Sequence, residues 1–218
     1  MASGRWAHPI ALVLAACCAA SLTLLTACAK DEPSPVTYGT LPTRFFSTPT
    51  ASADATPTAS ALPSLSPELQ AQRATALAEP KPPKPDITSQ NTPEGATNAV
   101  AYFFALYRYA FVTGDTTDLA SMSEDSCVFC KSAIDNATKL HQGGGWANPW
   151  EITIQDMSYT PPGTGKEYSA IQGTLVTTAS TTVSGAGDIT EEGNETTKLF
   201  IALRHNGEEW IIRGVSTE

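Results

Sequence analysis

Positive charge is scarce in this sequence. Its 218 residues include 13 Lys and Arg against 22 Asp and Glu, so the formal net charge is −9 at pH 7. Only 7 of the basic residues fall within residues 91–218, and they form no basic stripe. Proteins that bind nucleic acid neutralise its phosphates with clustered Lys and Arg. Nucleic acid is therefore not an expected partner, and the acidic surface is expected to keep the chain soluble.

Long hydrophobic runs are also missing, apart from one near the N-terminus. The run Ile10–Leu25 follows Arg5 and is shorter than the roughly 20 residues that a membrane-spanning helix needs. It ends in Leu25-Thr26-Ala27-Cys28, which resembles the lipobox of bacterial lipoprotein precursors. The resemblance implies a signal peptide over residues 1–27, cleavage before Cys28 and a diacylglyceryl group on the Cys28 thiol.

Acylation of Cys28 would anchor the chain on the outer face of the cytoplasmic membrane, because two acyl chains bind a bilayer durably. Two alternatives remain for the same segment. It could be an uncleaved membrane anchor, or an ordinary secretory signal that is cut near Ala27 or Ala29.

Large apolar residues are rare from residue 28 to residue 90. This stretch holds 11 of the 16 prolines and is rich in Ser, Thr and Ala. Such a composition cannot bury enough apolar surface to fold, so we predict a disordered tether over residues 28–90. Within it, Ser66-Pro67-Glu68 is typical of a helix start, and a few helical turns are predicted between there and Pro80.

A single folded domain is predicted over residues 91–218, which begin with helices. Thr92-Pro93-Glu94 marks a helix start, and apolar and aromatic side chains then recur at helical spacing until Gly114. An aromatic stripe at this spacing is more often core packing than a ligand site. The three predicted helices lie at residues 93–112, 115–122 and 127–141, and the last ends at the glycine run 143–145.

After the glycine run, the apolar period changes from helical to alternating. A strand that starts near Trp150 changes parity between Ile154 and Met157, which predicts a bulge. Further strands are predicted at residues 168–183, 196–204 and 209–215, with a flexible acidic turn at 185–193 and a hairpin at Asn206-Gly207. The order favours an α+β fold with about three N-terminal helices packed on a curved, cone-like, four-stranded antiparallel sheet.

Several motifs of the domain occur together in a recognisable series. They are Asn91-Thr92-Pro93-Glu94-Gly95-Ala96, Thr113-Gly114-Asp115-Thr116, Cys127-x-x-Cys130 and Gly144-Gly145-Trp146. The series resembles an uncharacterised family of actinobacterial lipoproteins whose domain of unknown function would cover about residues 88–218. The helices and the meander are also similar, more loosely, to the nuclear-transport-factor-2-like and cystatin-like superfamily. That fold is a cone that hosts ketosteroid-isomerase-type enzymes and many non-catalytic modules, so it implies no activity by itself.

Cysteines provide the sharpest local signal. Once Cys28 is acylated, Cys127 and Cys130 are the only pair outside the signal peptide, and exported thiols oxidise. We predict a structural disulfide between them at a helix start. A redox-active pair is the alternative, but Glu124 and Asp125 precede it and would oppose a thiolate.

Candidates for acid–base catalysis are few. Asp156, on a strand near the predicted bulge, is one carboxylate candidate, with Tyr107 or Tyr159 as its hydroxyl partner. His141 is the other candidate base, although a His at that position more often caps a helix C-terminus. A zinc site would need two ligands besides the cysteines, and His141 and His205 are poorly spaced for it. No metal and no cofactor are therefore expected.

The leading hypothesis is a membrane-anchored, non-catalytic module that binds a cell-wall component, a small ligand or another envelope protein. The first alternative is an isomerase- or hydrolase-like enzyme that uses the cone as its pocket. The second is a thiol–disulfide protein that uses Cys127 and Cys130. Asp156 facing inward beside a Tyr hydroxyl would favour the enzyme, whereas a filled cone would count against it.

Overall fold

The computed structural model describes residues 65–218. The predicted signal peptide, Cys28 and the first part of the predicted tether lie outside the described residues. Within residues 65–218, no helix combines the length and the apolar character that crossing a bilayer requires.

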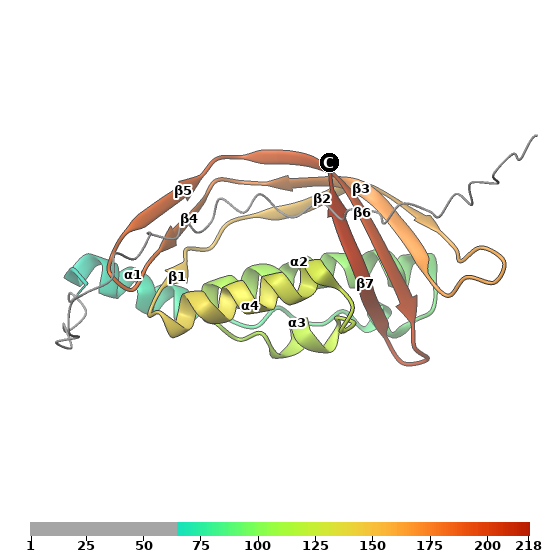
Figure 1. Ribbon diagram of the computed structural model, residues 1–218, viewed down its shortest axis with the longest axis horizontal. Helices are drawn as coiled ribbons and strands as arrows, with labels where there is room; N and C mark the ends of the chain where they lie inside the picture. The colour runs from blue at the N-terminus through green and yellow to red at the C-terminus, as the bar shows by residue number, and fades with distance from the viewer. Residues whose placement is uncertain (1–64) are drawn as a thin grey trace, which may run out of the picture. The chain divides into compact units, whose positions relative to one another are not determined.

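Helices come first along the described chain and strands follow, so the predicted α+β class is confirmed (Figure 1). The helices are α1 (Pro67–Leu77), the short 3-10 helix η2 (Asp86–Ser89), α2 (Pro93–Thr113), α3 (Thr117–Ser121) and α4 (Val128–Gln142). The strands are β1 (Trp146–Ala147), β2 (Ile152–Thr160), β3 (Ser169–Thr177), β4 (Ser180–Val183), β5 (Ile189–Glu192), β6 (Glu195–His205) and β7 (Trp210–Thr217).

The four-stranded sheet runs β2-β3-β6-β7, with every neighbouring pair antiparallel. Figure 1 shows this sheet curving over α2 and α4, which cover one of its faces. Side chains from α2 and from the covered face form one buried core, which includes Phe103, Ile171, Ile201 and Trp210. The predicted packing of helices on one face of the sheet is confirmed.

The sequence signals at both ends of α2 act as predicted. The Thr92 hydroxyl accepts a hydrogen bond from the Gly95 amide at 3.0 Å, which caps the first turn. Gly114 ends the helix in the left-handed conformation, with a φ of 85°. Between them, 10 residues of the helix are buried, as its aromatic stripe indicates.

The predicted bulge in the first long strand is also confirmed. The register between β2 and β3 shifts between Gln155 and Ser158, and Asp156 lies in the bulge with a φ of 52°. The extra residue restores the inward direction of Met157 and Tyr159, which pack against the core together with Ile154.

The prediction of one strand over residues 168–183 is wrong. The chain leaves the four-stranded sheet after Thr177, and β4 belongs to a separate three-stranded sheet of order β1-β4-β5. Two side chains fix the break, because the Thr178 hydroxyl accepts from the Glu151 amide and the Asn194 side chain accepts from the Ala179 amide at 2.7 Å. The Thr-rich alternation continues through the break, so the sequence pattern does not reveal it.

The predicted acidic turn over residues 185–193 is also wrong in part. Ile189–Glu192 forms strand β5, which pairs with β4 along its full length, and the turn is confined to the residues just before it. Most of β5 is exposed, so its acidic side chains remain in water while its backbone bonds to β4. The small sheet that results was not expected.

Residues 65–90, which composition assigns to the tether, are folded against the domain. The helix predicted after Ser66 is confirmed as α1, and Ala76 of this helix is buried with Val112, Trp146 and Val183. Composition failed here because a short helix needs only one small apolar face when another element supplies the rest of the core.

The segment from residue 79 to residue 90 is fastened across α2 and the sheet by polar contacts. Glu79 pairs with Arg108 at 2.8 Å, Lys81 with Asp118 at 2.9 Å and Lys84 with Glu209 at 2.7 Å. The segment ends where the Trp210 indole donates to the carbonyl oxygen of Gln90 at 2.9 Å. These contacts tie the segment to α2, α3 and β7. Because Leu65 also packs against the small apolar cluster around Ala76, the folded unit extends at least as far back as Leu65.

Burial of α1 gives a direct stability test. We expect Ala76→Asp to lower the free energy of unfolding by about 2 kcal/mol or more, because it places an unpaired carboxylate between α1 and the small apolar cluster. The matched control is Ala74→Asp, on the exposed side of the same helix. Urea unfolding of the two variants would show equal midpoints if α1 were not packed.

Candidate functional site

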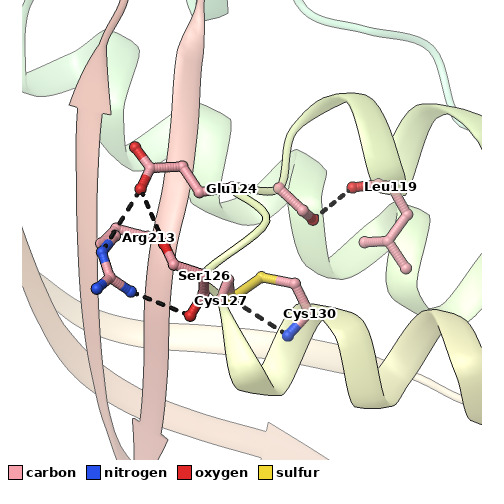
Figure 2. Close-up of a disulfide and its surroundings, with 7 residues drawn as sticks. Leu119, Glu124, Ser126, Cys127, Cys130 and Arg213 are labelled. Atoms are coloured by element: carbon pink, nitrogen blue, oxygen red, sulfur yellow. Dashed lines mark hydrogen bonds and ion pairs between the residues drawn. A yellow bond between two sulfur atoms is a disulfide. The ribbon is translucent and has the colours of Figure 1, made fainter.

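The predicted disulfide is present at the start of α4. Cys127 and Cys130 are joined, with their Cα atoms 5.3 Å apart, and Cys127 is the N-cap residue of the helix (Figure 2). The Cys127 sulfur also accepts a hydrogen bond from the Cys130 amide. Both residues have 0% of their surface exposed, so an attacking thiolate cannot reach the bond without a local opening.

A compact group of charged and polar side chains lies directly before the disulfide. We call it the Glu124 cluster, and its members are Glu124, Tyr168, Arg204 and Arg213. The Glu124 carboxylate lies 2.5 Å from Nε of Arg204 and 3.5 Å from Nε of Arg213, and the Tyr168 hydroxyl donates to it at 3.2 Å. Hydrogen bonding to Glu124 raises the pKa of Arg204 above its ordinary value.

The loop that carries Glu124 closes the free edge of β7. The Glu124 amide donates to the carbonyl oxygen of Ile212 at 2.9 Å, and the Ile212 amide donates to the carbonyl oxygen of Met122 at 2.7 Å. Figure 2 shows Arg213 beside the same loop, where it donates to the carbonyl oxygen of Ser126 at 3.1 Å. The disulfide, the cluster and the backbone pairing thus fix one short loop from three directions.

Sequence reasoning found the cysteines of this region but missed the cluster. From the sequence, Glu124 is only a charge that would oppose a thiolate, whereas in the structure two guanidinium groups compensate its charge. Its partners Arg204 and Arg213 lie on β6 and β7, far away in the chain, and each alone resembles an ordinary exposed strand residue. No local pattern reveals such a meeting.

The chemistry open to this region is limited. The carboxylate of Glu124 contacts four side chains, those of Arg204, Arg213, Tyr168 and Ser126, and the sulfur atoms are covered. A shallow depression beside the cluster is lined by Ser123, Asp125, Arg204 and Ile211 among others. The arrangement suits a rigid, polar surface feature better than thiol exchange.

The sequence candidate His141 serves as a connector between two helix ends. Its Nε2 lies 2.9 Å from the carbonyl oxygen of Phe111 in α2, which requires a proton on that nitrogen. Its ring is so close to Gly114 that a Cβ on this glycine would lie 2.8 Å from the His141 Cγ. Burial lowers the pKa of His141, so the neutral ring is favoured. These contacts hold the C-terminal end of α4 against α2.

The predicted catalytic partners are not brought together. Asp156 is exposed at the bulge and forms no hydrogen bond with another described side chain. The Tyr159 hydroxyl lies 3.0 Å from the Ser169 hydroxyl, and Tyr107 is packed among aromatic rings, where burial raises its pKa to about 12.

The space beneath the curved sheet is filled by side chains. Aromatic residues of α2, among them Phe103 and Phe104, meet Phe129 of α4 and the buried aliphatic residues of β3 and β6. A hollow beside this core, between Phe129 and Val215, has a volume of about 10 Å³, which is at the lower limit of the space that one water molecule needs. Within residues 65–218, no three His, Cys, Asp or Glu side chains are grouped as a metal site.

The folded unit coincides with a known sequence family. The model of the family of unknown function DUF6318 matches residues 71–216. The chain belongs to this family. The match begins inside α1, so the family domain includes the segment across α2 that composition assigns to the tether. No curated protein sequence matches the chain.

Solved structures give weaker likenesses. The intermembrane space region of the chloroplast protein ARC6 has 14% identity and a TM-score of 0.46, over 59% of this chain and 97% of that one. Aln2 from a Streptomyces species has 14% identity and a TM-score of 0.38, over 58% and 91%. An uncharacterized protein with a cystatin-like fold from Caulobacter vibrioides has 9% identity and a TM-score of 0.37, over 56% and 88%. Likenesses of this size carry no inference about function.

The disulfide is expected to contribute stability by restricting the unfolded chain. We expect Cys127→Ser combined with Cys130→Ala to lower the free energy of unfolding by about 2 kcal/mol. This is the low end of the usual range for a disulfide, because the bond closes only a short loop. Serine keeps an N-cap acceptor at position 127, so the pair of substitutions mainly removes the cross-link. Urea unfolding should place the variant near the reduced wild-type protein, and equal stability of variant and oxidised wild type would contradict the expectation.

The lowered pKa of His141 predicts a pH dependence of stability. As pH falls through the ordinary His value of 6.5, the unfolded chain takes up a proton that the folded chain resists. The free energy of unfolding should therefore decrease as the pH falls from about 7.5 to about 5, which is the interval around the ordinary His pKa. Urea unfolding of His141→Gln, which keeps a donor for Phe111, should show a smaller decrease; parallel profiles would contradict this assignment.

Proposed function

We propose that this chain is a cell-envelope lipoprotein of the actinobacterial type that the sequence motifs resemble. In this proposal the signal peptide is removed, Cys28 is acylated, and the domain is held on the outer face of the cytoplasmic membrane. The domain acts there as a non-catalytic binding module. Its ligand would be a component of the envelope: a wall polymer, a small molecule or another protein.

The observation that carries the proposal is the Cys127–Cys130 disulfide. Disulfides form and persist in oxidising compartments and are rare in the bacterial cytoplasm. Here the bond is fully buried at a helix start, beside a satisfied carboxylate, which is the setting of a structural bridge. A structural bridge in this domain agrees with export, and the lipobox-like residues before Cys28 supply the route.

The packing of the domain supports a non-catalytic role. An enzyme that used the cone would need a cavity with titratable groups facing it. Instead, aromatic side chains occupy the space under the sheet, and the two sequence candidates lie elsewhere: Asp156 on an exposed bulge and His141 between two helix ends. Binding through the surface fits this arrangement better than catalysis inside it.

The folded segment over residues 65–90 changes the reach of the proposed anchor. Only residues 29–64 remain as the tether that composition predicts. A random coil of about 36 residues has an end-to-end distance of roughly 33 Å, and a more extended chain reaches further. The domain would therefore work close to the membrane, within the inner part of the wall.

The anchor is tested by changing the lipidated cysteine. In bacteria fed an alkyne-bearing palmitate analogue, we expect the wild-type chain to take up the label and remain in the carbonate-washed membrane fraction. Cys28→Ser should lose the label and accumulate as unprocessed or soluble protein, because the acceptor thiol is gone. Gel fluorescence and fractionation measure both effects.

Cys17→Ser is the matched control, since it changes a cysteine inside the same N-terminal segment and should keep the label. A Cys28→Ser chain that stays equally membrane-bound, together with an unlabelled wild type, would indicate an uncleaved helical anchor instead. Release of both wild type and variant into the medium would indicate an ordinary secretory signal.

A further inference from the structure

The small sheet has a free edge at β5. In the strand order β1-β4-β5, β5 pairs only with β4, and Figure 1 shows it as the outermost strand. The Ser184 amide donates to the carbonyl oxygen of Asp188, so Asp188 and every second residue after it direct their backbone groups toward β4. The backbone groups of Ile189 and Glu191 therefore point outward, and no other strand of residues 65–218 pairs with them.

An apolar row that crosses the small sheet stops at this edge. Directly opposite residues of paired strands lie on the same face, and the register aligns Trp146, Val183 and Ile189. Trp146 and Val183 are buried in the small apolar cluster with Ala76, whereas Ile189 is 57% exposed. The row is incomplete, because only a residue of one more strand would cover Ile189.

The same edge is acidic. Four carboxylates lie on β5 or beside it, and none of them forms an ion pair with another described residue. They are Asp188, Glu191, Glu192 and Glu195. Like charges placed opposite each other destabilise strand pairing, so the β5 edge of a second copy is a poor partner. The edge instead favours a strand that is neutral or basic.

A segment of this chain that lies outside the described residues matches the edge in its sequence. Residues 33–53 contain one basic residue, Arg44, and no acidic residue. Within them, the six residues Thr43-Arg44-Phe45-Phe46-Ser47-Thr48 lie between Pro42 and Pro49 and contain no proline. Thr and Phe are favoured in strands, and six residues are enough to pair along the four residues of β5.

We propose that residues 43–48 add to the free edge of β5 as a fourth strand of the small sheet. In an antiparallel register, Phe46 pairs with Ile189 and Arg44 pairs with Glu191. The Phe46 ring then completes the apolar row, and the Arg44 guanidinium meets a carboxylate on the same face. The outward backbone groups of Ile189 and Glu191 gain hydrogen-bond partners. A parallel register is disfavoured, because it would place Phe46 opposite Glu191.

The place where the described chain begins agrees with this register. Leu65 lies beside the turn between β4 and β5, since a Cβ on Gly187 would lie 3.5 Å from a side-chain carbon of Leu65. In the antiparallel register, Thr48 lies opposite Gly187, so both ends of residues 49–64 are at this turn. These 16 residues can close a loop there, because the entropic cost of closure rises only slowly with length.

An added strand would shorten the tether of the proposed lipoprotein. Only residues 29–42 would remain between Cys28 and the folded unit, a random coil of roughly 20 Å. The inference goes beyond the proposed function, because neither the anchor nor the binding role requires this strand.

Hydrogen exchange of the full-length chain in a mild detergent, resolved to single amides by mass spectrometry, tests the pairing. We expect the Ile189 and Glu191 amides to exchange at least about tenfold more slowly in wild type than in Phe46→Ser or Arg44→Glu. The first substitution removes the apolar contact, and the second places two carboxylates opposite each other. The Thr190 amide faces β4 and should stay protected in every variant, which shows that the sheet is folded.

Phe45→Ser is the matched control. Phe45 would lie on the opposite face of the added strand, away from the apolar row, so its substitution should leave the protection within about twofold of wild type. Arg44→Glu combined with Glu191→Arg should restore the protection, because the reversed pair is again attractive.

Three results would overturn the proposal. The first is a wild-type chain in which the Ile189 and Glu191 amides exchange as fast as unbonded amides. The second is protection that persists in both Phe46→Ser and Arg44→Glu or rises with protein concentration, because another molecule would then occupy the edge. The third is an equal effect of Phe45→Ser and Phe46→Ser. Because the lipid label at Cys28 is read out separately, either proposal can fail without the other.

Discussion

The aromatic helix α2 must be buried on almost every side, and the rest of the domain is arranged to satisfy that requirement. Several sides of α2 are buried, as the residues Ala96, Tyr102, Phe103 and Leu106 show. A helix that is apolar all round needs partners on all sides. The curved sheet and α4 cover part of it, and α1 and the segment over residues 79–90 cover the remainder. For this reason the folded unit cannot begin at the start of α2.

The same packing determines what lies under the curved sheet. Within residues 65–218, the rings of α2 fill the space under the curved sheet, and the hollow beside this core has a volume of about 10 Å³. The loop beside β7 is rigid, because the disulfide and the contacts of Glu124 both hold it.

Most of the structure that could be predicted depends on local signals in the sequence. Thr92 and Gly114 bound α2 because capping and the left-handed stop depend only on neighbouring residues. The bulge at Asp156 was visible as a change of parity within one strand. The break after Thr177 was not, because it depends on Glu151 and Asn194, whose positions are set by other strands. The Cys127–Cys130 pair was predictable at its short spacing, whereas the arginines that meet Glu124 come from separate strands.

The sequence by itself determined the α+β order of elements, the ends of the helices, the hairpin before β7 and the family, and it provides the lipobox-like motif on which the proposed anchor rests. These depend on adjacent residues or on a fixed period. Only the tertiary structure decided that residues 65–90 fold, that Asp156 lies on an exposed bulge and His141 between two helix ends, and that the space under the sheet is filled. Each of these depends on contacts between distant segments, and the burial of α2 is what brings those segments together.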